Sequence, residues 1–221
     1  MTDSYSNTMF MKVISLLFLS FLLTYRPVAA ATEEPWQPLL KAQLQALEKA
    51  TPSAWAPHVD TLAKLAGQYP DIWLLQYYAG WAYTQLSFKT PKKMSEVLCN
   101  QAEPFVRKAL ALQPGNTETL TLMGYWLSAR INAVPSRGAA LGAESRDYAQ
   151  KAISADSSNP RAFLIKALNI YYTPAIFGGG KKRARAVVEE TGAKFAAFTP
   201  ADEFSPAWGK NIYEVLQASY K

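Results

Sequence analysis

A turn phrase that recurs three times along the chain constrains the fold more than any other feature. The three phrases are Tyr69-Pro70-Asp71, Gln113-Pro114-Gly115-Asn116 and Asp156-Ser157-Ser158-Asn159-Pro160. Each precedes a helical stretch rich in large apolar residues, and the phrases repeat about every 43–44 residues, a spacing typical of helical repeat proteins. Such repeats predict stacked antiparallel helix pairs that bury their apolar faces against neighbouring pairs.

Residues inside the repeats support one common register. Small residues recur where the two helices of a pair must approach closely, at Gly80, Gly124 and Ala167. Larger residues recur around them, with Gln76, Leu120 and Phe163 in one equivalent position and Tyr83, Leu127 and Ile170 in another. We therefore predict an all-α fold, a right-handed α-solenoid of antiparallel helix pairs with about eight or nine helices.

Helical periodicity covers most of the chain, and no strand-like alternation persists. The predicted helices span 36–49, 55–68, 72–86, 95–112, 117–133, 143–155, 160–172, 180–198 and 206–220. Pro104 falls inside the fourth range and marks either a kink or a new helix start.

The turn phrases, the small residues and the alanine-rich second helices together resemble tetratricopeptide repeats. The resemblance implies a superhelix whose concave face takes a protein or peptide. Because that family's usual period is about 34 residues, we expect the additional residues to form loops at 87–94 and 131–142. A narrower likeness, to a group of exported bacterial tetratricopeptide-repeat proteins, includes Phe177-Gly178-Gly179-Gly180-Lys181 and Pro206-Ala207-Trp208-Gly209. It implies a fold and a location but no particular activity.

The first residues have the pattern of a secretory signal. Lys12 precedes an apolar stretch at 13–23, and Val28-Ala29-Ala30 has the small-residue pattern of a cleavage site. We predict that 1–31 is a cleaved signal peptide and that 32–221 is a single helical repeat domain in the periplasm. The alternative is an uncleaved anchor in the inner membrane that faces the periplasm.

The net charge limits the possible binding partners, and the cysteine content limits the possible disulfides. The formal net charge of +6 favours acidic surfaces or anionic lipid headgroups, whereas nucleic acid is not expected for an exported protein with dispersed charge. Cys99 is the only cysteine, so no internal disulfide forms, and we predict that its thiol is buried.

Three polar residues in and directly after the third turn phrase have predicted structural roles. Asp156 and Asn159 are expected to cap the turn and the helix that follows it. Arg161 is placed to pair with an acidic side chain across the repeat.

Aromatic residues form a candidate partner-binding surface. Trp73, Tyr77 and Trp81 recur every four residues and therefore share one helical face, and Trp126 lies on a later helix. Tryptophan and tyrosine are frequent binding anchors because they combine contact area with a polar group. The alternative is ordinary packing between helices.

A glycine run forms a candidate anion site. Gly178, Gly179 and Gly180 precede Lys181 and Lys182, so free backbone N–H groups at a helix start and two cations could hold a phosphate, a carboxylate or a lipid headgroup. The alternative is a tight turn between two repeat helices.

Catalytic patterns are missing from the sequence. His58 is the sole histidine, no nucleophile-elbow motif occurs, and the adjacent Glu189 and Glu190 point in different directions on a helix. We predict a non-enzymatic scaffold without cofactor or metal that binds a protein or peptide partner in its concave face. The alternative is a periplasmic module for a small molecule or envelope lipid, with an anionic-group site near Gly178–Arg185.

Overall fold

The structure is a computed structural model that describes residues 34–221, so the predicted signal peptide lies outside the described part. Residues Pro35–Lys221 form one compact unit. The described residues contain nine α-helices, three short 3-10 helices and no strand, which confirms the all-α prediction. The α-helices are α2 (Gln37–Lys49), α3 (Ala56–Gln68), α4 (Trp73–Phe88), α5 (Lys92–Leu112), α6 (Thr117–Ala133), α7 (Gly138–Ala155), α8 (Pro160–Tyr172), α9 (Lys181–Ala197) and α10 (Lys210–Ala218). The 3-10 helices are Pro52–Ala54, Pro135–Arg137 and Ala175–Phe177.

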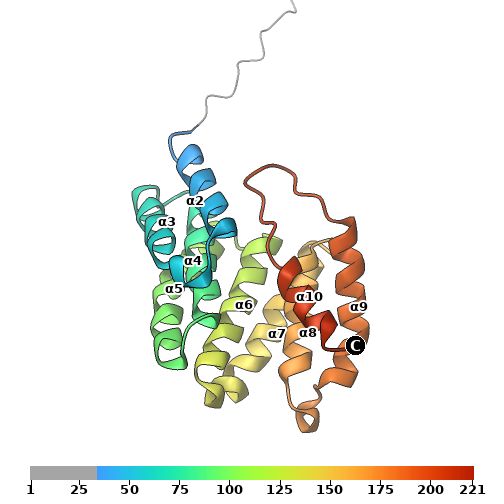
Figure 1. Ribbon diagram of the computed structural model, residues 1–221. Coiled ribbons are helices and arrows are strands. Elements are labelled where there is room, and N and C mark those ends of the chain that lie inside the picture. Colours follow the sequence, from blue (N-terminus) through green and yellow to red (C-terminus); the bar gives the residue numbers. More distant parts are fainter. Residues whose placement is uncertain (1–33) are drawn as a thin grey trace, which may run out of the picture. The chain divides into compact units, whose positions relative to one another are not determined.

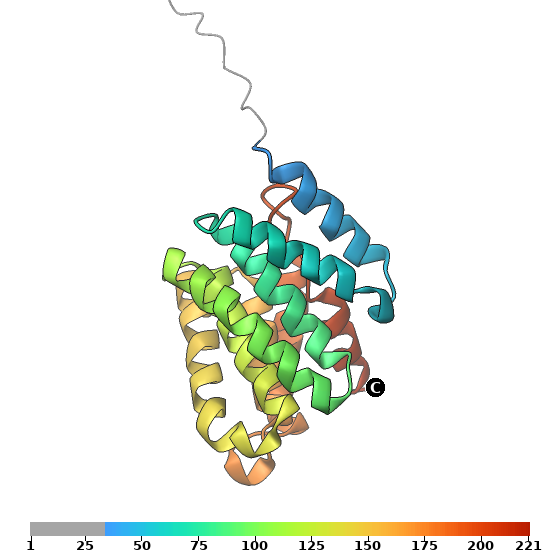
Figure 2. The ribbon, with the colours of Figure 1, turned by 90° about the vertical axis from the view of Figure 1, so that its left-hand side faces the viewer.

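Consecutive helices pack against each other along the chain, as the prediction of helix pairs requires. Alternate helices also meet, because α4 contacts α6 and α6 contacts α8. Figure 1 shows the helices following one another across the unit, with α10 lying over α8. In the side view of Figure 2 the C-terminal part of the chain (red) lies behind the green helices α4 and α5.

Two glycines allow close approaches between the paired helices α4 and α5 and the paired helices α6 and α7. A Cβ atom at Gly80 would lie 2.8 Å from a methyl carbon of Val106 on α5. At Gly124 it would lie 3.2 Å from the carbonyl oxygen of Ser145 on α7. The repeated small residues therefore do what the sequence pattern predicted, since a larger side chain would push each pair apart.

Asparagine side chains cap the N-termini of the two equivalent helices α6 and α8. The Asn116 side chain accepts a hydrogen bond from the backbone N–H of Glu118, and Asn159 accepts one from the N–H of Arg161. Each satisfies an N–H group that has no partner inside its own helix. Asp156 accepts from the Ser158 backbone N–H at 2.8 Å. The predicted capping roles are confirmed.

The additional residues of each repeat lengthen the helices, so the prediction of loops at 87–94 and 131–142 is wrong. The loop between α4 and α5 contains only three residues, 89–91, and a 3-10 turn leads directly into α7 at Gly138. Helix α5 continues across Pro104 without a new start. The first turns of α5, with Lys92 and Lys93, and of α7, with Gly138 and Gly142, lack apolar periodicity, so the sequence pattern did not indicate them as helical.

Most of the buried apolar side chains of α2 to α6 form one continuous cluster, and a second cluster joins α8, α9 and α10. Cys99 lies in a small satellite cluster with Ala129 and Ala133 and is fully buried, as predicted. Burial raises the pKa of its thiol above the ordinary value, which disfavours the reactive thiolate.

Candidate functional site

A segment without regular secondary structure, residues 198–209, connects α9 to α10 and returns to the N-terminal half of the unit; we call it the strap. The hydroxyl of Tyr78 on α4 donates to the carbonyl oxygen of Phe204 at 2.8 Å. The Phe204 ring also packs against Trp36, with centroids 5.8 Å apart. The strap thus joins the last helices to the first part of the chain.

Trp208, near the end of the strap, lies on the face formed by α4 and α6. Its ring stacks on Tyr125 at a centroid distance of 5.0 Å and lies 6.4 Å from the ring of Trp81. Its Nε1 donates to the hydroxyl oxygen of Tyr77 at 2.7 Å. Trp81 and Tyr125 each follow the small residue of their repeat. One side chain of the strap therefore packs against the same register position in two successive repeats.

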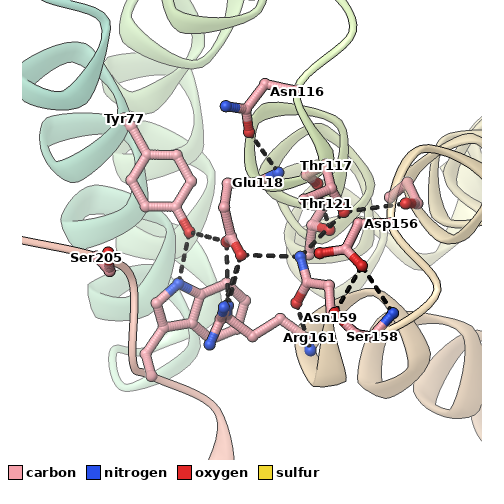
Figure 3. A network of polar contacts seen from close by, with 12 residues as sticks. Tyr77, Asn116, Thr117, Glu118, Thr121, Asp156, Ser158, Asn159, Arg161 and Ser205 are labelled. Atoms are coloured by element: carbon pink, nitrogen blue, oxygen red, sulfur yellow. Dashed lines mark hydrogen bonds and ion pairs between the residues drawn. The ribbon is translucent and has the colours of Figure 1, made fainter. Parts of the chain in front are cut away.

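A buried polar network centres on Glu118 of α6 (Figure 3). The guanidinium Nη2 of Arg161 on α8 donates to Glu118 Oε1 at 2.6 Å, and Asn159 Nδ2 donates to the same oxygen at 2.8 Å. The Tyr77 hydroxyl of α4 donates to Oε2 at 3.0 Å. Glu118 is 8% exposed and Arg161 2% exposed. The predicted partner of Arg161 across the repeat is therefore Glu118.

The network connects α4, α6 and α8 to the strap. The Arg161 guanidinium lies 4.4 Å from the ring centroid of Phe198, at the start of the strap. Burial, followed by the negative charge of Glu118, raises the pKa of Tyr77 well above its ordinary value, so this phenol stays protonated as a donor. Both carboxylate oxygens of Glu118 accept hydrogen bonds, so this side chain connects the first helices of three repeats.

The predicted partner-binding residues Trp73, Tyr77 and Trp81 are close together on α4. The rings of Trp73 and Tyr77 are 6.0 Å apart, and Trp73 is only partly buried. Tyr77 and Trp81 are buried, with Trp208 against them. In this conformation the strap covers the aromatic surface of α4 that a partner would have to contact.

Trp126 does not join the other three. Its indole is fully buried, and Nε1 donates to the carbonyl oxygen of Cys99 on α5 at 2.8 Å. The guanidinium groups of Arg107 and Arg130 lie 5.3 and 4.9 Å from its ring centroid. This placement favours the packing interpretation for Trp126 over a role as a partner anchor.

The glycine run forms a tight turn between α8 and α9. Gly178 and Gly180 have φ angles of 87° and 100°, which favour glycine. The N–H groups of Gly178, Gly179 and Gly180 donate to carbonyl oxygens of 170–175, so the turn itself uses the N–H groups that the sequence suggested for an anion. The cationic side chains of Lys181 and Lys182 remain exposed as candidates.

Tyrosine rings and cations gather beside this turn, in a group that we call the end cluster: Tyr171, Tyr172, Lys181, Arg185 and Tyr220. The Tyr171 ring lies 5.0 Å from that of Tyr172 and 6.1 Å from that of Tyr220. Lys181 Nζ and the Arg185 guanidinium lie 5.2 and 4.8 Å from the Tyr220 ring centroid. The Tyr220 hydroxyl donates to the carbonyl oxygen of Lys181 at 2.7 Å.

A surface depression of about 180 Å³ adjoins the end cluster, between α9 and α10. Its lining includes Arg185, Val188, Glu189, Tyr213 and Tyr220. Sites that enclose drug-sized ligands measure about 300–1,000 Å³. The depression can therefore hold part of such a ligand, whose remainder would lie on the tyrosine rings.

No metal centre or membrane span appears in residues 34–221. His58 Nδ1 lies 2.9 Å from Gln43 Oε1, and no three His, Cys, Asp or Glu side chains of the described part group together as metal ligands. None of the helices in that part is long and apolar enough to cross a bilayer.

The sequence reasoning missed three residues that the site depends on. The sequence predicts only that Trp208 lies in a helix over 206–220, whereas α10 begins at Lys210, and it gives no role to Glu118 or Tyr220. Trp208 stood in a segment already noted for its resemblance, and Glu118 occupies the same position after its cap as Arg161 does. Opposite charges in equivalent repeat positions were thus the available signal for the ion pair.

Comparison with known proteins gives one informative likeness. No protein-family model matches the chain, and no curated protein matches its sequence. Among solved structures, the HusA haemophore from Porphyromonas gingivalis is similar, with a TM-score of 0.73 and 27% sequence identity. The alignment covers 87% of this chain and 96% of the haemophore. The chain therefore shares its helical fold with a haem-binding protein over nearly the whole length of both.

Proposed function

We propose that the protein is a binding module for a small amphiphilic anion with a flat apolar ring, of which haem is the reference ligand. The observation that carries this proposal is the likeness to a haemophore over nearly the whole chain. The proposal keeps the expectations of a non-enzymatic, exported protein with a tetratricopeptide-like superhelix. It replaces a protein partner by a small ligand, because the strap covers Tyr77 and Trp81.

The end cluster is the proposed site. Tyr171, Tyr172 and Tyr220 offer three neighbouring rings on which a flat ring can stack, and such contacts favour offset or edge-to-face geometry. Lys181 and Arg185 offer cations beside these rings for a carboxylate group. The proposed site thus uses side chains of the Gly178–Arg185 segment rather than its glycine N–H groups.

The charges of the site set the orientation of a ligand. Glu189 lies in the adjoining depression and repels a second carboxylate there. The anionic edge of the ligand therefore faces Lys181 and Arg185, and the apolar body lies on the tyrosine rings. Because the site is open to water, we expect a contact weaker than an enclosed haem pocket would give.

Titration with haem, followed by its absorbance and by quenching of protein fluorescence, tests the proposal. Arg185→Gln removes a cation, and Tyr172→Ser removes an exposed ring. We expect each to weaken the Kd about tenfold, equivalent to roughly 1.4 kcal/mol. Arg146→Gln removes an exposed cation of α7. It is the matched control and should leave the Kd unchanged.

The outcomes separate the function from the site. Saturable binding of haem that Arg185→Gln and Tyr172→Ser do not weaken would place the ligand elsewhere on the protein. A wild-type protein that shows no saturable binding of haem would refute the proposed function itself. Circular dichroism of each variant checks that the helices are retained.

A further inference from the structure

The turn between α8 and α9 exposes two large apolar side chains at its tip. Ile176 is 85% exposed and Phe177 74% exposed, and Tyr172 one helical turn earlier is also 74% exposed. Scattered single apolar residues are normal on a protein surface, but adjacent ones that protrude together mark contact sites. We call Ile176 and Phe177 the apolar tip.

The turn holds this tip in a fixed position. Gly180 N–H donates to the carbonyl oxygen of Ile170 at 2.8 Å, and Phe177 N–H donates to that of Pro174 at 2.9 Å. A Cβ atom at Gly179 would lie 2.2 Å from the carbonyl oxygen of Thr173, so only glycine fits there. The exposure of the tip is therefore built into an ordered turn and is not the result of a loose loop.

Cations adjoin the apolar tip on its C-terminal side. Lys181, Lys182 and Arg183 follow the glycines directly and are exposed, and Arg185 comes two residues later. Within residues 34–221, no acidic side chain forms an ion pair with Lys182 or Arg183. Arg183 Nη1 donates to the carbonyl oxygen of Ala175 at 3.0 Å, so its charge is not neutralised by a carboxylate. An apolar tip next to such cations is complementary to a bilayer, which has an apolar interior and, with anionic lipids, a negatively charged surface.

We propose that the apolar tip is a docking surface for an anionic lipid bilayer. Ile176 and Phe177 enter the boundary between headgroups and acyl chains, and Lys182 and Arg183 meet the lipid phosphates. Each cation near an anionic bilayer adds to the attraction, which falls off within a Debye length. This inference concerns residues outside the haem-type site and does not rest on the proposed function.

Co-sedimentation with vesicles tests the docking surface on the whole protein. We expect binding to phosphatidylcholine vesicles that contain phosphatidylglycerol, weaker binding at high salt, and no binding to phosphatidylcholine alone. The double variant Ile176→Ser with Phe177→Ser should weaken vesicle binding at least about tenfold. The matched control is Met94→Ser with Val97→Ser, two exposed apolar residues of α5, and it should bind as the wild type does.

Three outcomes would overturn the proposal. One is a wild-type protein that does not sediment with phosphatidylglycerol vesicles. Another is a tip variant that binds as well as the control variant. The last is full competition by inorganic phosphate at the ionic strength of the assay, which would indicate a site for small anions. Unchanged haem binding by the tip variant shows that the ligand site and the docking surface are separate.

Discussion

The indole Nε1 of Trp208 lies 2.7 Å from the hydroxyl oxygen of Tyr77, a residue 131 positions earlier in the chain. The same hydroxyl donates to Glu118, so it accepts one hydrogen bond and donates another. A side chain of the strap is thereby connected to the ion pair that joins α6 and α8. Strap and repeats should therefore unfold together rather than in separate steps.

Trp208→Phe and Trp208→Ala test this connection. The phenylalanine variant keeps an aromatic ring but leaves the Tyr77 oxygen without its donor, so we expect a loss of about 1–2 kcal/mol in the free energy of unfolding. The alanine variant also removes the stacking on Tyr125, and about 2–4 kcal/mol should be lost from this partly buried site. Urea denaturation measures both. An alanine variant as stable as the phenylalanine variant would mean that the ring packing contributes nothing.

Removal of only one charge of the Glu118–Arg161 pair should strongly lower the free energy of unfolding. Glu118→Gln leaves the Arg161 guanidinium buried without its counter-charge, and we expect a loss of about 3–5 kcal/mol. Glu118→Leu combined with Arg161→Met removes both charges and should cost less than the two single changes added together. A double-mutant cycle by urea denaturation measures the difference.

An exposed ion pair provides the control for that cycle. Glu103 and Arg107 lie one turn apart on α5, and Glu103→Gln should cost at most about 0.5 kcal/mol. Additive effects of Glu118→Leu and Arg161→Met, similar to those at the exposed pair, would show that the buried network is not coupled.

Alkaline pH should unfold the protein through its buried phenols. Burial raises the pKa of Tyr77, Tyr78 and Tyr125 above the ordinary value, so the folded state keeps their protons when the unfolded state has lost them. The stabilisation is complete below the unfolded-state pKa of about 10 and is lost as the pH rises above it. In a spectrophotometric titration, the buried phenols of Tyr77, Tyr78 and Tyr125 should ionise only with the loss of helical signal. Ionisation of these three phenols near pH 10 with the helical signal retained would contradict this expectation.

Local signals in the sequence predicted much of the fold because they act over a few residues. Asn116 and Asn159 cap helices through neighbouring N–H groups, and Gly80 and Gly124 mark close approaches within a pair. These features leave a pattern at fixed spacing, which is why helices α6 and α8 were predicted with their observed bounds. The start of α7 was missed because Gly138 and Gly142 give no apolar periodicity.

The candidate site was less predictable because it depends on contacts between distant segments. Nothing near Trp208 indicates that it returns to Tyr77, and nothing near Tyr220 indicates that it meets Lys181. The aromatic spacing of α4 correctly placed its rings on one face, but sequence spacing cannot show which segment covers that face. The glycine run was likewise recognised as a turn or an anion site, and only the hydrogen bonds show that the turn uses its N–H groups.

The single cysteine should react slowly in the native protein. Cys99 is fully buried, and desolvation raises the pKa of its thiol, so both access and thiolate fraction are low. We expect a thiol reagent at neutral pH to modify the native protein far more slowly than the urea-unfolded protein. Equal rates for the two would show that α5 and α6 open readily around Cys99.

Replacement of Gly179 should disrupt the turn between α8 and α9, whereas replacement of an unhindered helical glycine should not. In Gly179→Ala the new Cβ would lie 2.2 Å from the carbonyl oxygen of Thr173, so the backbone must move, and we expect a loss of about 2 kcal/mol or more. Gly67→Ala on α3 meets no atom within 4 Å and should raise the free energy of unfolding by about 0.5–1 kcal/mol. Urea denaturation compares the two, and hydrogen exchange at the Gly180 amide reports the turn directly. Protection of that amide in Gly179→Ala equal to the wild type would show that the turn accommodates a side chain, and the fixed geometry assigned to it would be wrong.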